Sequence, residues 1–216
     1  MAISALCTLA NAAPAPKPDT PFPTALNQLD ADGNITWTPT ASGGRTAQIP
    51  FDEIDSAVLP ATPKLKQRGS GSPGSGVERW TNLGQIANYA AEYACQDTGA
   101  YALSSVIESS APDACKALVR MTPGAPIASK AWNVWQGAQA AAANGEGEPV
   151  QTIYRFFYKS AGAPKLDEGM CKKAMGILTE SACQGKGGNG DSTRGGEIRI
   201  GGDDDYIQIG FDPNDV

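Results

Sequence analysis

The sequence contains no histidine. Without an imidazole group, the Ser-His-Asp and Cys-His arrangements of many hydrolases cannot form, and a common side-chain metal ligand is missing. We therefore predict no catalytic residue, no metal site and no cofactor, and we favour a non-enzymatic function. An enzyme that works with paired carboxylates remains an alternative, with Glu108, Glu168 and Glu180 as candidate acids.

Basic residues are outnumbered and long apolar runs are absent. The chain has 17 Lys and Arg residues against 23 Asp and Glu residues, which gives a formal net charge of −6. Such a chain gains little free energy from counterion release on nucleic acid, so nucleic acid is not expected as a partner. It is also repelled by anionic membrane surfaces. No stretch reaches the roughly 18 apolar residues of a membrane-spanning helix, so no transmembrane segment is expected.

Glycine and proline are abundant, with 25 and 16 residues, and both concentrate in a few stretches of the chain. We interpret residues 14–76 as a disordered Pro/Gly/Ser-rich leader, within which residues 35–49 could supply an edge strand. A basic segment, Lys64–Arg68, precedes the linker-like residues 69–76. Cleavage of a propeptide after Arg68 is one interpretation, and a retained N-terminal arm is the other.

The N-terminus has features of a secreted precursor. Residues 1–13 form a short apolar run that includes Ala10-Asn11-Ala12, which fits the small-x-small cleavage pattern of a signal peptide. Removal of this segment would also remove Cys7. Asn34 begins an Asn-Ile-Thr glycosylation sequon. These features predict a secreted, extracellular protein that is glycosylated at Asn34.

The four remaining cysteines are Cys95, Cys115, Cys171 and Cys183, an even set that predicts two disulfides. If residues 170–183 form one helix, Cys171 and Cys183 lie roughly 18 Å apart at about 1.5 Å per residue. This separation exceeds the Cα–Cα limit of ~7 Å for a disulfide, so their pairing is excluded, and Cys95–Cys115 with it. Two pairings remain: Cys95–Cys171 with Cys115–Cys183, or Cys95–Cys183 with Cys115–Cys171.

Residues 77–216 are predicted to form one disulfide-bonded α+β domain. We expect about three helices packed on an antiparallel sheet of about three to five strands, in an α/β-sandwich-like arrangement. Apolar spacing of three and four residues predicts helices over 77–95, over 114–120 after Asp113 as N-cap, and over 168–182 after Asp167 as N-cap.

β-Branched and aromatic residues predict strands over 101–107 and 150–158, and a hairpin formed by 197–200 and 206–211. In the hairpin, period-two alternation places Ile198 and Ile200 on one face of the first strand. Ile207 and Ile209 share one face of the second strand.

Two patterns have both a ligand interpretation and a structural one. A short helix is expected near Trp132 and Trp135, which would share a face and either stack on a sugar ring or pack in the core. These two residues are our candidate ligand-binding residues. Asp203-Asp204-Asp205, with Asp191, Asp212 and Asp215, could bind calcium, but a solvated hairpin tip is favoured.

The C-terminal part of the chain resembles small secreted fungal proteins of the cysteine-bonded effector and killer-toxin-like group. The resemblance lies in Ser181-Ala182-Cys183-Gln184-Gly185, in Thr193-Arg194-Gly195-Gly196, and in the closing hairpin that ends Asp212-Pro213-Asn214. It implies a fungal origin and an effector or toxin-like interaction protein whose partner is an extracellular protein or glycan. A cell-wall glycan binder and a carboxylate-dependent glycoside hydrolase are the alternatives. No functional residue is carried over from the group.

Overall fold

An eight-stranded antiparallel sheet organises the molecule, with the strand order β1-β2-β6-β7-β10-β9-β4-β3. The computed structural model describes residues 22–58, 80–96, 100–137, 150–185 and 190–215. The predicted signal peptide and Arg68 lie outside these residues. The predicted α+β class is confirmed, while the sheet is larger than expected.

The elements have the following bounds. The strands of the large sheet are β1 (Thr38–Pro39), β2 (Arg45–Pro50), β3 (Thr81–Ile86), β4 (Tyr89–Cys95), β6 (Ala131–Gln136), β7 (Val150–Tyr158), β9 (Gly196–Gly201) and β10 (Tyr206–Asp215). Two short strands, β5 (Ala102–Leu103) and β8 (Ser192–Thr193), pair separately. The helices are α1 (Phe22–Ala31), α2 (Phe51–Val58), α3 (Ser104–Met121) and α4 (Glu168–Ile177), and α4 continues into the π-helical turn η1 (Leu178–Ala182).

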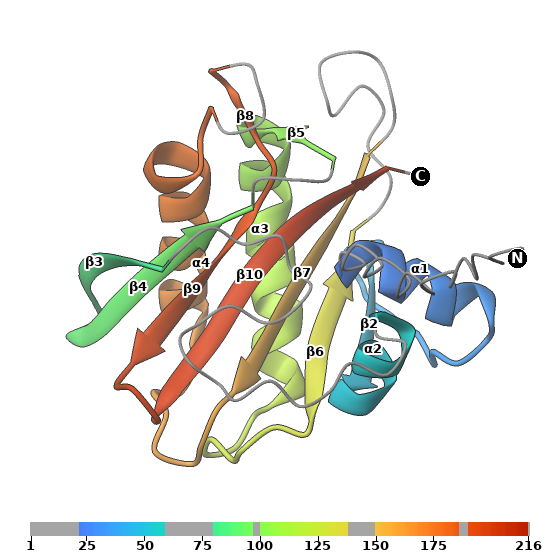
Figure 1. Ribbon diagram of the computed structural model, residues 1–216, viewed down its shortest axis with the longest axis horizontal. Coiled ribbons are helices and arrows are strands. Elements are labelled where there is room, and N and C mark those ends of the chain that lie inside the picture. Colours follow the sequence, from blue (N-terminus) through green and yellow to red (C-terminus); the bar gives the residue numbers. More distant parts are fainter. Residues whose placement is uncertain (1–21, 59–79, 97–99, 138–149, 186–189, 216) are drawn as a thin grey trace, which may run out of the picture.

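Helices α3 and α4 cover one face of the sheet (Figure 1). In the predicted hairpin, Ile207 pairs with Ile200 and Ile209 pairs with Ile198, and all four side chains are fully buried beneath the helices. Complete burial of one such side chain stabilises the fold by about 1.5–3 kcal/mol. The hairpin and its shared apolar faces are therefore confirmed.

Helices α1 and α2 cover the opposite face, over β2, β6 and β7 (Figure 1). Their apolar side chains form a second, separate core with residues of the sheet. The buried members of this core are Phe22, Ala25, Leu26, Leu29, Ala47, Ile49, Ile54, Trp132, Val134 and Ile153.

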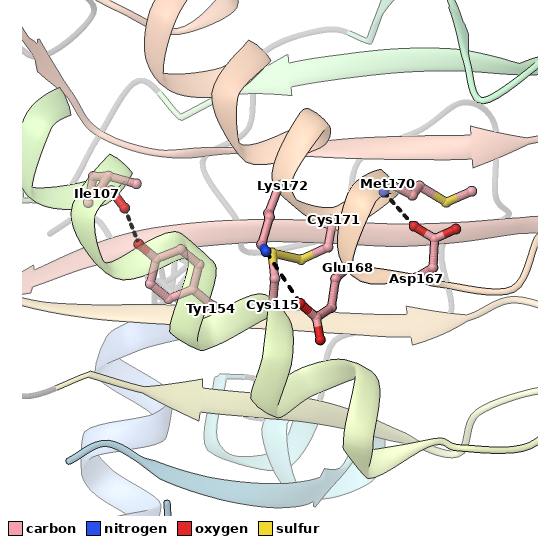
Figure 2. The surroundings of a disulfide bond; sticks show 8 residues. All are labelled: Ile107, Cys115, Tyr154, Asp167, Glu168, Met170, Cys171 and Lys172. Carbon is pink, nitrogen blue, oxygen red and sulfur yellow. Dashed lines mark hydrogen bonds and ion pairs between the residues drawn. A yellow bond between two sulfur atoms is a disulfide. The ribbon is translucent and has the colours of Figure 1, made fainter. Parts of the chain in front are cut away.

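The predicted central strand and the last predicted helix are also confirmed. Strand β7 pairs with β6 on one side and β10 on the other. The Asp167 side chain accepts a hydrogen bond from the Met170 backbone N–H at 2.7 Å and so caps α4 (Figure 2). No helix in the described part of the chain is long and apolar enough to span a membrane.

The helix predicted over 77–95 is wrong, because residues 81–95 form the β3–β4 hairpin. Ala87 and Asn88 both have positive φ values, 49° and 68°, at its two-residue turn, as hairpin turns matching the twist of the strands require. Ala91 is buried opposite Ile200 of β9. Pairing with a neighbouring strand thus overrides the helix propensity of an alanine-rich segment.

The strand predicted over 101–107 and the helix predicted to begin after Asp113 are also wrong as stated. Only Ala102–Leu103 is strand, and α3 runs without interruption from Ser104 to Met121 with Pro112 inside it. Asp113 is therefore an interior helical residue. The buried side chains of α3 recur at helical spacing, so their packing on the sheet holds the helix through a proline that would be unfavourable in isolation.

The chain folds well before the predicted domain start at residue 77. Residues 22–58 form α1, β1, β2 and α2, so the prediction of a disordered leader is wrong for this part of residues 14–76. The apolar side chains of Phe22, Ala25, Leu26 and Leu29 follow helical spacing, a pattern hidden by the proline-rich composition around it. Four α-helices, rather than about three, are therefore present among the described residues.

Candidate functional site

Two disulfides cross-link the described chain, one between β4 and the end of η1 and the other between α3 and α4. They join Cys95 to Cys183 and Cys115 to Cys171, with Cα–Cα distances of 5.4 and 5.6 Å. This is one of the two pairings that the sequence left open. The second bond links α3 to α4 directly, beside the exposed Glu168–Lys172 ion pair (Figure 2). All four cysteines are at most 1% exposed, so their sulfurs serve the structure and are shielded from thiol exchange.

A buried ion cluster lies on the second face of the sheet, beneath α1. The Arg155 guanidinium donates to the Glu197 carboxylate at 2.7 Å and forms an ion pair with Asp212, and all three side chains are 1% exposed. The ring of Phe22 covers the guanidinium, 4.2 Å from its central carbon. One cation thus serves two buried carboxylates, and each of them depends on it.

A second arginine extends this cluster toward the surface. Gln208 donates to Glu197 at 2.6 Å and accepts from Arg199 at 2.9 Å. Arg199 also lies over the rings of Trp80 and Tyr206, at 3.9 and 4.9 Å. Its guanidinium is therefore fixed by stacking and hydrogen bonding and is not free to meet a ligand.

The candidate acids of a hydrolase are all exposed, and none of them lines the groove described below. Glu108 and Glu168 lie on the exposed sides of α3 and α4, and Glu180 is exposed on η1. The close acid pair that the structure does contain, Glu197 and Asp212, was not singled out from the sequence. Because both of its members are buried on Arg155, this pair cannot reach a substrate in the described conformation.

An open groove of about 370 Å³ lies between the outer side of α3 and the β1–β2 connection. It is lined by Pro39, Thr40, Ala41, Ser42, Thr46, Asp113, Lys116, Ala117, Arg120 and Met121. The two cations lie one helical turn apart on α3. Ala117 and Met121 add apolar surface, and Asp113 is the single carboxylate of the lining. No sequence motif marks this groove, because its two walls are about 70 residues apart in the chain.

Both cations of the groove remain open to a ligand. Neither Lys116 nor Arg120 has an ion-pair partner among the described residues. The opposite wall is more constrained, because the Thr40 hydroxyl donates to the Gly44 carbonyl at 2.8 Å. The groove therefore combines a hydrogen-bonded turn on one wall with two cationic side chains on the other.

The predicted ligand-binding tryptophans do not share a surface. They lie on strand β6 rather than on the expected helix, and their side chains point to opposite faces of the sheet because they are three residues apart. Trp132 is 7% exposed and packs edge-on against Phe22 and Phe157, while Trp135 is 3% exposed and packs near Tyr154. Neither ring presents an open face for a sugar.

The remaining predicted positions lie on the surface. Asn34 is exposed just after α1, where a glycan has room to attach. The Asp203–Asp205 tip is also exposed, and the Ser160 hydroxyl donates to the Asp205 carboxylate. No group of three or more potential metal ligands occurs in the described part of the chain.

Comparisons with known proteins give no match to a protein family, a curated protein or a solved structure.

Proposed function

We propose that this protein is an extracellular interaction protein of the effector or toxin-like kind, which acts by binding and not by catalysis. The groove beside α3 carries this proposal. It is open, neither of its two cations has an ion-pair partner among the described residues, and Asp113 is the one carboxylate among the described residues that line it. The close pair of carboxylates is instead buried on Arg155, where it stabilises the fold. The buried disulfides suit a protein that persists outside the cell.

The chemistry of the groove favours an acidic protein partner. Lys116 and Arg120 form a local cationic site on a chain whose net charge is −6. An acidic side chain could bind both cations while its neighbours contact Ala117 and Met121. Charge complementarity at such a site gives specificity for acidic partners. The affinity for such a partner falls as salt is added, because salt screens the attraction between the charges.

The glycan and hydrolase alternatives have less support. A glycan binder needs exposed aromatic faces, and both Trp132 and Trp135 are buried. A glycosidase needs two carboxyl groups about 5–10 Å apart across a cleft. The described groove offers only Asp113.

The test is a titration of the full-length, isotope-labelled protein followed by amide chemical shifts. The probes are hexaglutamate, hexalysine and a chitin oligosaccharide. We expect hexaglutamate to shift amides of residues 40–46 and 113–121 in a saturable, salt-sensitive way. The double variant Lys116→Glu/Arg120→Glu should weaken this binding at least about tenfold, since it replaces both attractive charges with repulsive ones.

A matched control is the double variant Lys159→Glu/Lys173→Glu, which makes the same change of net charge at two exposed sites outside the groove. This control should bind hexaglutamate nearly as well as the unchanged protein. An equal loss of hexaglutamate affinity in both double variants would mean that net charge alone controls binding. That result would overturn the groove as the binding site. Saturable binding of the oligosaccharide alone would overturn the acidic partner and favour the glycan alternative.

A further inference from the structure

The described chain consists of two parts that are joined by non-covalent contacts. We call residues 22–58 the N-terminal unit and the described residues from 80 to 215 the sheet domain. The larger apolar core lies entirely within the sheet domain, and so do both disulfides. The N-terminal unit contributes only to the smaller core. The sheet domain thus has a core and cross-links of its own.

The contact between the two parts resembles an interface between separate molecules. Strand β2 pairs with β6 over six residues, and Ala47 and Ile49 lie opposite Val134 and Trp132. Around this apolar centre, Arg45 donates to Gln136 at 2.6 Å and Gln48 donates to Asn133 at 2.9 Å. An apolar centre with a hydrogen-bonded rim is the usual anatomy of a protein–protein interface.

Removal of the N-terminal unit would uncover a binding surface. Strand β6 would lose its outer neighbour and become an edge strand with unpaired backbone groups. Beside it, Trp132, Val134 and Ile153 would be exposed, together with the guanidinium of Arg155 that Phe22 now covers. An edge strand next to apolar side chains is a template for adding a strand from another chain.

We propose that the N-terminal unit is a strand donor and that the surface beneath it accepts the N-terminal unit of a second copy of this chain. The accepted strand repeats the pairing of β2, with Ala47 and Ile49 directed toward the smaller core. After such an exchange, each groove combines β1–β2 residues of one copy with α3 of the other. This inference stands independently of the ligand proposed for the groove.

Covalent connection keeps the unit bound to its own sheet domain. A tethered segment competes at an effective concentration of about millimolar, which free copies in dilute solution do not reach. The connection runs through residues 59–79, and no described disulfide crosses it. A cut in this connection removes the tether and leaves the interface intact. Exchange should therefore depend on cleavage.

The experiment uses the full chain with a specific protease site in place of residues 64–68. We expect the cut protein to keep its circular dichroism spectrum, to show the summed mass of both pieces in native mass spectrometry, and to separate into two pieces when denatured. A fluorescent synthetic peptide of residues 22–58 should then bind the cut protein saturably. Uptake by the uncut protein should be at least about 100-fold slower, because the tethered unit competes.

Two peptide variants make the test specific. Ile49→Asp places a charge in the smaller core and should abolish uptake, while Thr24→Asp adds the same charge at an exposed position of α1 and should leave uptake unchanged. Loss of the folded spectrum on cutting would overturn the proposal, as would separation of the pieces without rebinding. Equal uptake by cut and uncut protein, or equal uptake of both peptide variants, would also overturn it.

Discussion

At the scale of single residues, the buried cluster around Arg155 places three charged side chains where water cannot solvate them. The guanidinium binds two carboxylates, and Asp212 Oδ1 has no hydrogen-bond partner among the described residues. Charges removed from water in this way persist only while they are paired. The cluster should therefore be sensitive to loss of its single cation.

Arg155→Met tests this dependence. The substitution keeps much of the side-chain volume but leaves Glu197 and Asp212 buried without their cation, which should cost about 3–5 kcal/mol of unfolding free energy. Urea denaturation at neutral pH measures the loss. Arg199→Met is the control, because the side chain of Arg199 is 17% exposed and that of its partner Glu92 is 43% exposed, so a smaller loss is expected. A loss below about 1 kcal/mol for Arg155→Met would contradict the proposed role of the cluster.

Tyr154 couples the sheet to α3 and gives the stability a pH dependence. Its hydroxyl donates to the Ile107 carbonyl at 3.0 Å (Figure 2) and lies 2.7 Å from the Ser110 hydroxyl. Burial raises the pKa of Tyr154 well above the ordinary value of 10.0. Burial likewise raises the pKa of Tyr206. The folded protein thus retains protons that the unfolded chain releases above about pH 10, so stability should fall as pH rises beyond that point.

Tyr154→Phe isolates this contribution. At neutral pH the variant should lose about 0.5–1.5 kcal/mol for each of the hydroxyl's two hydrogen bonds, to Ile107 and Ser110, that is removed. Above about pH 10 its unfolding free energy should fall less steeply than that of the unchanged protein, because one shifted group is gone. Urea unfolding at a series of pH values measures both effects. Parallel pH curves for the two proteins would contradict the assignment.

At the scale of elements, the pairing of β2 with β6 joins the N-terminal unit to the large sheet. Gly44 precedes β2 and lies directly against the indole ring of Trp135. A Cβ atom added there would lie 2.5 Å from the ring. A side chain at this position must therefore displace either Trp135 or the start of β2.

Gly44→Ala should destabilise the protein by about 1–3 kcal/mol through this overlap. Gly124→Ala is the matched control, because nothing lies within 4 Å of the added atom at that position. Hydrogen exchange should show the loss concentrated in β2 and β6. Equal stability of the two variants would mean that β2 does not dock as described.

Sequence patterns predicted the C-terminal elements better than the N-terminal ones, for physical reasons. Strand β7 and the hairpin of β9 and β10 are rich in β-branched and aromatic side chains. Apolar residues that alternate in this way indicate a strand and do not fit a helix. In β4, alanines fit helical spacing and strand pairing equally well, and the neighbouring β9 decides between them. In α3, Asp113 fits a helix N-cap, although tertiary packing carries one helix from Ser104 to Met121 through Pro112.

The candidate site could be predicted only in part. Helical geometry reduced the disulfide pairings to two, and the choice between them needed the relative positions of β4, α3 and η1. The cluster around Arg155 and the groove beside α3 combine residues distant in sequence, so local periodicity could not reveal either of them. The prediction that Trp132 and Trp135 share a face was wrong because they lie on a strand. Residues three apart lie on the same face of a helix but on opposite faces of a strand.

At the scale of the whole molecule, the described chain is a disulfide-bonded domain whose second face is covered by its own N-terminal unit. The proposed extracellular binding role requires that both disulfides form and that the protein leaves the cell. These properties can be measured together, without knowledge of the partner.

The most direct measurement is the intact mass of protein secreted by a fungal host that expresses the sequence from Met1, taken before and after removal of N-linked glycans and, after their removal, with and without reduction. We predict that the protein appears in the medium, gains about four mass units on reduction of its two disulfides, and loses glycan mass in an Asn34→Gln variant. Protein retained inside the cell with Cys95, Cys115, Cys171 and Cys183 as free thiols would contradict the account.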